Sequence, residues 1–141
     1  MKLRRVLLAC LTVLCWMTLA WAEQASNVMT VSAGDGKVHT SDPDCDSVGT
    51  WCGWINVVLP AGSQFDSASV AGSTDGQTFV SCPAVLNGPK YQYMDCTNIK
   101  IRFLNTKPEI VSTSSGVQIN WKMVNWNAHK AWGKLVVNYH Q

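Results

Sequence analysis

The end of the chain decides the fold: it reads VQINWKMVNW over residues 117–126 and AWGKLVVNYH over residues 131–140. In the first segment apolar residues alternate with polar ones, and this period of two is typical of a strand with one buried face. The second segment is rich in β-branched and aromatic residues, which suit a pleated surface. Because the residues between them, 127–130, form a polar joint, we predict a long β-hairpin over residues 117–140.

Outward from this hairpin, short extended segments separated by turn residues fill the chain. The clearest segments are residues 53–59 and 98–104, and Asp75-Gly76 between the extended runs 65–71 and 77–82 is a hairpin signal. This pattern predicts a single all-β domain, an antiparallel β-sandwich or a small barrel. Its core is expected to contain the inward-facing apolar residues Val57, Leu59, Val70, Phe79, Ile99, Ile101, Phe103, Ile119, Trp121, Leu135 and Val137.

The first 22 residues have the pattern of a secretory signal peptide. A basic start, Met1 to Arg5, precedes an apolar run, and Ala20-Trp21-Ala22 is a small-x-small cleavage site. We therefore expect cleavage after residue 22, a secreted or periplasmic location, and a soluble domain over residues 23–141. Residues 23–27 are expected to be a loose leader before a first strand at residues 28–31.

Cleavage would change the charge of the working protein. The chain has 11 basic and 9 acidic residues, and Lys2, Arg4 and Arg5 lie in the signal peptide. Eight basic residues then remain against all nine acidic ones, so the net charge becomes −1. Because no basic run remains either, the composition argues against nucleic acid as a partner.

Four of the six cysteines lie beyond the signal peptide, at Cys45, Cys52, Cys82 and Cys96. An even number in an exported chain indicates two disulfides. Of the three possible pairings we favour Cys45–Cys52 with Cys82–Cys96, because each bond then closes a loop of turn residues. The spacings lack the C-x-x-C pairs of a zinc site and the histidines are scattered, so we predict no metal site and no cofactor.

No set of residues has a convincing catalytic pattern. The serines occur in no Gly-x-Ser-x-Gly elbow, and the only glutamates, Glu23 and Glu109, lie at the expected loose start and beside a proline. Asp42, Asp44 and Asp46 resemble the first half of a calcium loop, whose later ligand positions are missing. We therefore predict that the protein is not an enzyme.

The five tryptophans that remain after cleavage are the most suggestive feature. Trp126 and Trp132 are expected to face away from the core, and Trp51 lies in an expected loop. A tryptophan beside asparagines suits stacking on a sugar face with hydrogen bonds to hydroxyl groups, and it suits a protein interface as well. Plain packing is the alternative for each tryptophan. The predicted ligand-binding residues are Trp126, Trp132, His129, Asn127 and Trp51.

One stretch resembles a known family. Residues 73–79, STDGQTF, are similar to a hairpin that recurs in the discoidin-like carbohydrate-binding modules, which are β-sandwiches. Residues 98–104 and 134–139 are similar to later strands of those modules. The resemblance carries no ligand residues over to this chain.

Three hypotheses of function follow. The first is a secreted or periplasmic binding module that recognises a glycan or a protein surface. The second is an inhibitor that blocks a partner enzyme with the loop at residues 127–130 or the loop at residues 42–51. The third is a toxin-like or membrane-active subunit. The ligand and the oligomeric state stay open at this stage.

Overall fold

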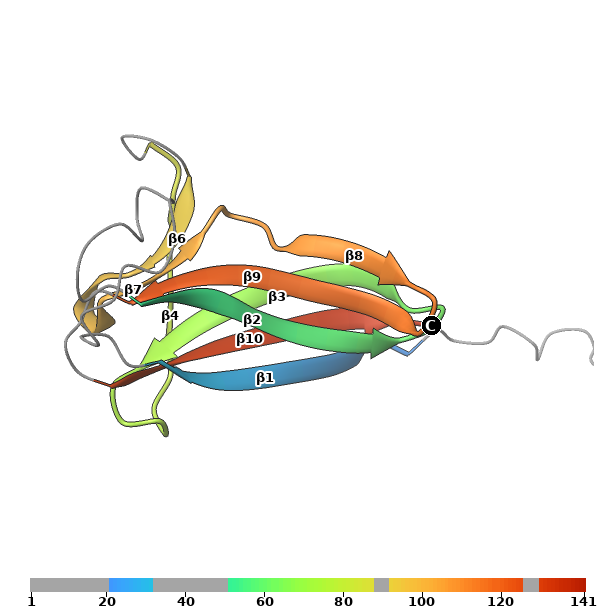
Figure 1. Cartoon of the computed structure of the whole chain (residues 1–141), viewed down its shortest axis with the longest axis horizontal. Coiled ribbons are helices and arrows are strands. Elements are labelled where there is room, and N and C mark those ends of the chain that lie inside the picture. The colour runs from blue at the N-terminus through green and yellow to red at the C-terminus, as the bar shows by residue number, and fades with distance from the viewer. Residues whose placement is uncertain (1–20, 32–50, 88–91, 126–129) are drawn as a thin grey trace, which may run out of the picture.

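The computed structural model describes residues 21–31, 51–87, 92–125 and 130–141 (Figure 1). This part of the chain forms ten strands and one short 3-10 helix, and no helix in it is long and apolar enough to cross a membrane. In chain order the elements are β1 (Glu23–Val31), β2 (Trp51–Pro60), β3 (Gln64–Ser73), β4 (Val80–Ser81), β5 (Ala84–Val85), β6 (Tyr93–Cys96), η1 (Thr97–Ile99), β7 (Ile101–Leu104), β8 (Glu109–Thr113), β9 (Gly116–Asn125) and β10 (Ala131–His140).

The strands form two antiparallel sheets, consistent with the predicted β-sandwich. The four-stranded sheet has the order β1-β10-β3-β4. The six-stranded sheet has the order β2-β9-β7-β6-β5, and β8 also pairs with β9. In Figure 1 the long strands β2 and β9 of the six-stranded sheet lie across β3 and β10 of the other sheet.

The core lies between the two sheets and draws on both of them. Ile55 of β2, Met123 of β9 and Leu135 of β10 are each fully buried in one cluster. Burying an aliphatic side chain of this size stabilises the fold by about 1.5–3 kcal/mol. All the predicted core residues are buried except Phe79, which is half-buried: its ring centroid lies 5.4 Å from the ammonium nitrogen of Lys134, at an outward position of β10.

The predicted hairpin over residues 117–140 is wrong. Its two strands exist, but β9 pairs with β2, β7 and β8, whereas β10 pairs with β1 and β3 in the other sheet. Each of the two strands has one apolar side. In a sandwich the apolar sides of β9 and β10 cover each other across the core, whereas in a hairpin the two strands would lie side by side in one sheet. At Gly133 the sheets approach so closely that a Cβ atom would overlap the Cε atom of Met123.

The loose leader predicted at residues 23–27 is also wrong, because these residues belong to β1. The strand pairs with β10 along its whole length, from Glu23 opposite Tyr139 to Val31 opposite Ala131. Backbone pairing with β10 therefore orders a segment that was expected to be loose. At its start, a hydrogen bond with Glu23 raises the pKa of the Tyr139 phenol.

The strand predicted at residues 98–104 is shorter than expected. Residues 97–99 form the 3-10 helix η1, and Lys100 then adopts a left-handed conformation with φ 63°. The backbone N–H of Lys100 donates a hydrogen bond to the carbonyl oxygen of Thr97 at 3.3 Å. This turn places Ile99 in the core before β7 begins.

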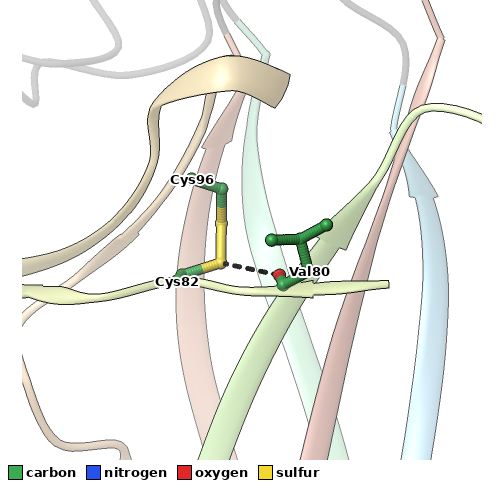
Figure 2. The surroundings of a disulfide bond; sticks show 3 residues. All are labelled: Val80, Cys82 and Cys96. Atoms are coloured by element: carbon green, nitrogen blue, oxygen red, sulfur yellow. Dashed lines mark hydrogen bonds between the residues drawn. A yellow bond between two sulfur atoms is a disulfide. The ribbon is translucent and has the colours of Figure 1, made fainter. Parts of the chain in front are cut away.

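The disulfide predicted between Cys82 and Cys96 is confirmed (Figure 2). Cys82 follows β4 of the four-stranded sheet and Cys96 ends β6 of the six-stranded sheet, so the bond ties the two sheets together. Closing a loop of this length stabilises a fold by about 3 kcal/mol. The second predicted bond involves Cys45, which lies outside the described residues, so the pair Cys45–Cys52 stays a prediction.

Candidate functional site

Strand β2 presents one buried face and one exposed face. Its odd-numbered residues from Ile55 to Leu59 are buried in the core. Trp54, Asn56 and Val58 therefore point outward, and Trp54 keeps 50% and Val58 62% of its surface in contact with solvent. These two side chains give the outer side of β2 an apolar surface that includes an aromatic ring.

The neighbouring strands continue this surface with polar side chains. Residues that lie opposite each other in an antiparallel pair point to the same face. The register places Asn120 of β9 between Asn56 of β2 and Glu109 of β8, and it places Gln118 between Val58 and Val111. Trp54 of β2 and Lys122 of β9 form one further opposed pair. We call the surface formed by these side chains the open face, and it consists of Trp54, Asn56, Val58, Glu109, Val111, Gln118, Asn120 and Lys122.

The open face is rich in hydrogen-bonding groups. Adjacent strands are about 4.8 Å apart, and side chains on one face recur about every 6.8 Å along a strand. Within the described part of the chain, the side-chain amides of Asn56, Gln118 and Asn120 make no hydrogen bond to another residue. Because each amide offers both donors and an acceptor, the face can bind a ligand that carries hydroxyl groups.

The residues that define the open face include few groups of the kinds used in catalysis. Glu109 is its one carboxylate, whereas glycoside hydrolysis uses two carboxyl groups on either side of the scissile bond. Among the described residues there is no group of three or more His, Cys, Asp and Glu side chains that could hold a metal ion.

Trp132, one of the predicted ligand residues, lies on the outer side of the four-stranded sheet and not on the open face. It is half-buried, and the ammonium nitrogen of Lys130 lies 5.0 Å from its ring centroid. The ring also packs against Gly76, where a Cβ atom would come within 2.8 Å of the indole Cε2 atom. Trp132 is thus partly covered by the turn between β3 and β4.

The turn that covers Trp132 is held by Asp75. One oxygen of its carboxylate accepts hydrogen bonds from the backbone N–H groups of Thr78 and Gln77, each at 2.8 Å, and from the Ser73 hydroxyl at 2.8 Å. In that order these bonds lower the pKa of Asp75 to about 2. The Ser73 oxygen in turn accepts a bond from the N–H of Gly76 at 2.9 Å. The turn is therefore a closed hydrogen-bond network.

The other predicted ligand residues are not placed by the structure. Trp126, Asn127 and His129 lie outside the described residues. Trp51 was expected in a loop, but its backbone begins β2 opposite Asn125. The description does not extend to the Trp51 side chain.

A cavity of about 310 Å³ lies beside the disulfide and is lined by residues of β4, β6 and η1. Asp95 is the only titratable group of its lining, and the other lining side chains are small, apolar or uncharged: Val80, Ser81, Pro83, Cys96, Thr97, Asn98 and Ile99. One oxygen of Asp95 is buried and the other lies 3.9 Å from a guanidinium nitrogen of Arg102. The cavity therefore offers no acid–base pair.

Trp54 is the residue that the sequence analysis missed. The signal was present, because the alternation that turns Val57 and Leu59 inward also turns Trp54 outward. No family model matches the chain, and comparison with curated proteins and with solved structures found no match either.

Proposed function

We propose that this protein is a secreted or periplasmic, non-enzymatic binding module that recognises a glycan through the open face of its six-stranded sheet. The observation that carries the proposal is the half-exposed Trp54 on the outer side of the six-stranded sheet, with amide side chains in the rows beside it. An indole ring can stack on the apolar face of a sugar ring. The neighbouring amides can then hydrogen-bond the hydroxyl groups around the edge of that ring.

The amides favour a glycan over a dry protein interface. A polar group that is buried without a partner costs about 1–3 kcal/mol, so three amides without a partner among the described residues would weaken a tightly packed apolar contact. Sugar hydroxyl groups are both donors and acceptors, and they can satisfy the amides of Asn56, Gln118 and Asn120 together. The low net charge of the chain fits an uncharged ligand as well.

The experiment that tests this proposal is a titration of the oxidised protein against a panel of soluble glycans by isothermal calorimetry. Trp54→Ala should weaken binding at least tenfold, equivalent to about 1.4 kcal/mol, because it removes the stacking surface. Trp132→Ala is the matched control, since it removes the same side chain from the opposite outer face and should leave the affinity unchanged.

Two results would contradict the proposal. The first is the absence of binding across the whole panel. The second is a Trp54→Ala protein that binds as tightly as the unaltered protein. The residues predicted at positions 126, 127 and 129 stay predictions, and their alanine variants belong in the same series. Peptide mapping without reduction tests the second proposed disulfide, Cys45–Cys52.

A further inference from the structure

The open face consists of three rows of side chains that run across the strands, and the rows differ in chemistry. The first row is Trp54 opposite Lys122, an aromatic ring and a cation. The second row is Asn56, Asn120 and Glu109, which are all polar. One cation and one carboxylate leave the face without net charge, so it is complementary to an uncharged ligand.

The third row provides apolar surface again at the far end of the face. Gln118 of β9 lies between Val58 of β2 and Val111 of β8. The two valines keep 62% and 37% of their surface in solvent, and the Gln118 amide makes no hydrogen bond to another described residue. Apolar surface with a few polar groups that fix orientation is typical of ligand sites, so the third row can bind part of a ligand.

The first and third rows are too far apart for one sugar ring to contact both. Side chains on one face of a strand recur about every 6.8 Å, so Trp54 and Val58 are about 13.6 Å apart along β2. Within its own row Trp54 is followed by the charged Lys122, so a ligand that stacks on the indole reaches further apolar surface along the strand. A ligand that uses all three rows therefore needs several rings joined in an extended chain.

We propose that the open face binds an extended, uncharged oligosaccharide of at least three rings, which lies along β2 and β9. This inference rests on the proposed function and adds to it the length and the direction of the ligand. One ring stacks on Trp54, and the amides of Asn56 and Asn120 bind hydroxyl groups in the middle of the chain. The distal ring packs on Val58 and exchanges hydrogen bonds with the Gln118 amide, so Gln118 selects for chain length.

The test is isothermal calorimetry with β-1,4-linked oligomers of glucose, N-acetylglucosamine and mannose, each from one to four rings, because these linkages keep the chain extended. In the series that binds, three rings should bind at least about tenfold more tightly than one, and a fourth ring should add less than about twofold. Equal affinity for one and three rings would overturn this inference and leave glycan binding through Trp54 in place. No binding by any of the three series would overturn it as well, whereas the proposed function fails only on the wider panel.

Variants of the third row give an independent measurement. Gln118→Ala should lower the affinity for three rings at least about fivefold and leave that for the single sugar unchanged. Val58→Ser, at an exposed position, should have the same selective effect because it removes apolar surface. Gln24→Ala is the matched control, since it removes the same amide from the outer side of the four-stranded sheet and should change neither affinity. Each variant is measured with both ligands, so a partly unfolded sample does not change the ratio of the affinities. A loss that is equal for both ligands, or the absence of a loss in Gln118→Ala and Val58→Ser, would overturn the proposal.

Discussion

The two outer faces of the molecule surround a tryptophan in different ways. On the four-stranded sheet, Trp132 is half-buried, with Gly76 against its ring and the Lys130 ammonium group 5.0 Å from its centroid. On the six-stranded sheet, Trp54 keeps 50% of its surface in solvent. Both residues lie on long strands with alternating burial, so the strand itself does not cause the difference. The turn at residues 73–78 covers one ring, and the other ring projects from an edge strand.

The polar side chains of the two faces differ in the same sense. On the four-stranded sheet Asn138 accepts a hydrogen bond from Gln24 at 3.1 Å and donates one to Ser67 at 3.0 Å, which links three strands. His140 and Asp66 form a further contact at 2.8 Å. On the open face the amides have no such partners among the described residues. Polar side chains that hydrogen-bond one another have fewer donors and acceptors available for a ligand than side chains without such bonds.

The largest loss of stability is expected at the core between the two sheets, on which both outer faces depend. Gly133→Ala places a methyl group against the Cε and Sδ atoms of Met123, and the fully buried Met123 side chain would have to shift within the core, so the protein should lose about 1–3 kcal/mol of unfolding free energy. Urea denaturation measures this loss. Ser69→Ala, at an exposed position of the neighbouring strand β3, is the control and should change stability by less than about 0.5 kcal/mol. An unaltered midpoint for Gly133→Ala would contradict the close approach of the sheets.

A smaller loss of stability is expected for a change at the turn that covers Trp132 on the four-stranded sheet. Gly76 has φ 76°, and a Cβ atom there would meet the Trp132 ring, so Gly76→Ala should cost about 1–2 kcal/mol and displace the indole. Denaturation and acrylamide quenching of tryptophan fluorescence measure the two consequences. Gly76→Asn separates them, because asparagine tolerates positive φ but still carries a Cβ atom. Quenching that stays unchanged in both variants would show that Gly76 does not cover Trp132.

Removal of the two tryptophans should differ in its effect on stability. Trp132→Ala exposes the turn that packs on it and should cost about 1–2 kcal/mol, whereas Trp54→Ala removes a side chain that already keeps half of its surface in solvent and should cost less. Thermal and urea unfolding of the two variants under the same conditions give the comparison. Equal losses of stability in the two variants would mean that Trp132 and Trp54 are packed equally well against their surroundings.

The smallest effect concerns the pH dependence of the covered face. Asp75 has a pKa of about 2 in the folded protein against an ordinary value of 3.8, so its carboxylate stabilises the fold above the ordinary value. This contribution should decline as the pH falls below about 3.8 and be lost as the pH passes through about 2. Asp75→Asn keeps an acceptor oxygen without the titration, so the difference in Tm between the two proteins should shrink over that range. A difference that stays constant with pH would contradict the network at this turn.

The local pattern of the sequence determined the elements of this protein and their buried faces. Alternation identified β2 and β9 and turned Val57 and Ile119 inward, because the side chains of a strand point to opposite faces in turn. The same rule was sufficient to place Trp54 outside. The spacing of cysteines in turn-rich loops also identified the Cys82–Cys96 bond, since a short loop is the easiest to close.

Only the tertiary structure decided which strands pair and which outward residues stay open. A period of two gives the face of a side chain but not the partner of a strand, so β9 and β10 were expected in one hairpin and lie in two sheets. Trp132 and Trp54 both point outward by local rules, yet a turn from a distant part of the chain covers only Trp132. Pairing and coverage depend on contacts between residues far apart in sequence, which local periodicity does not contain.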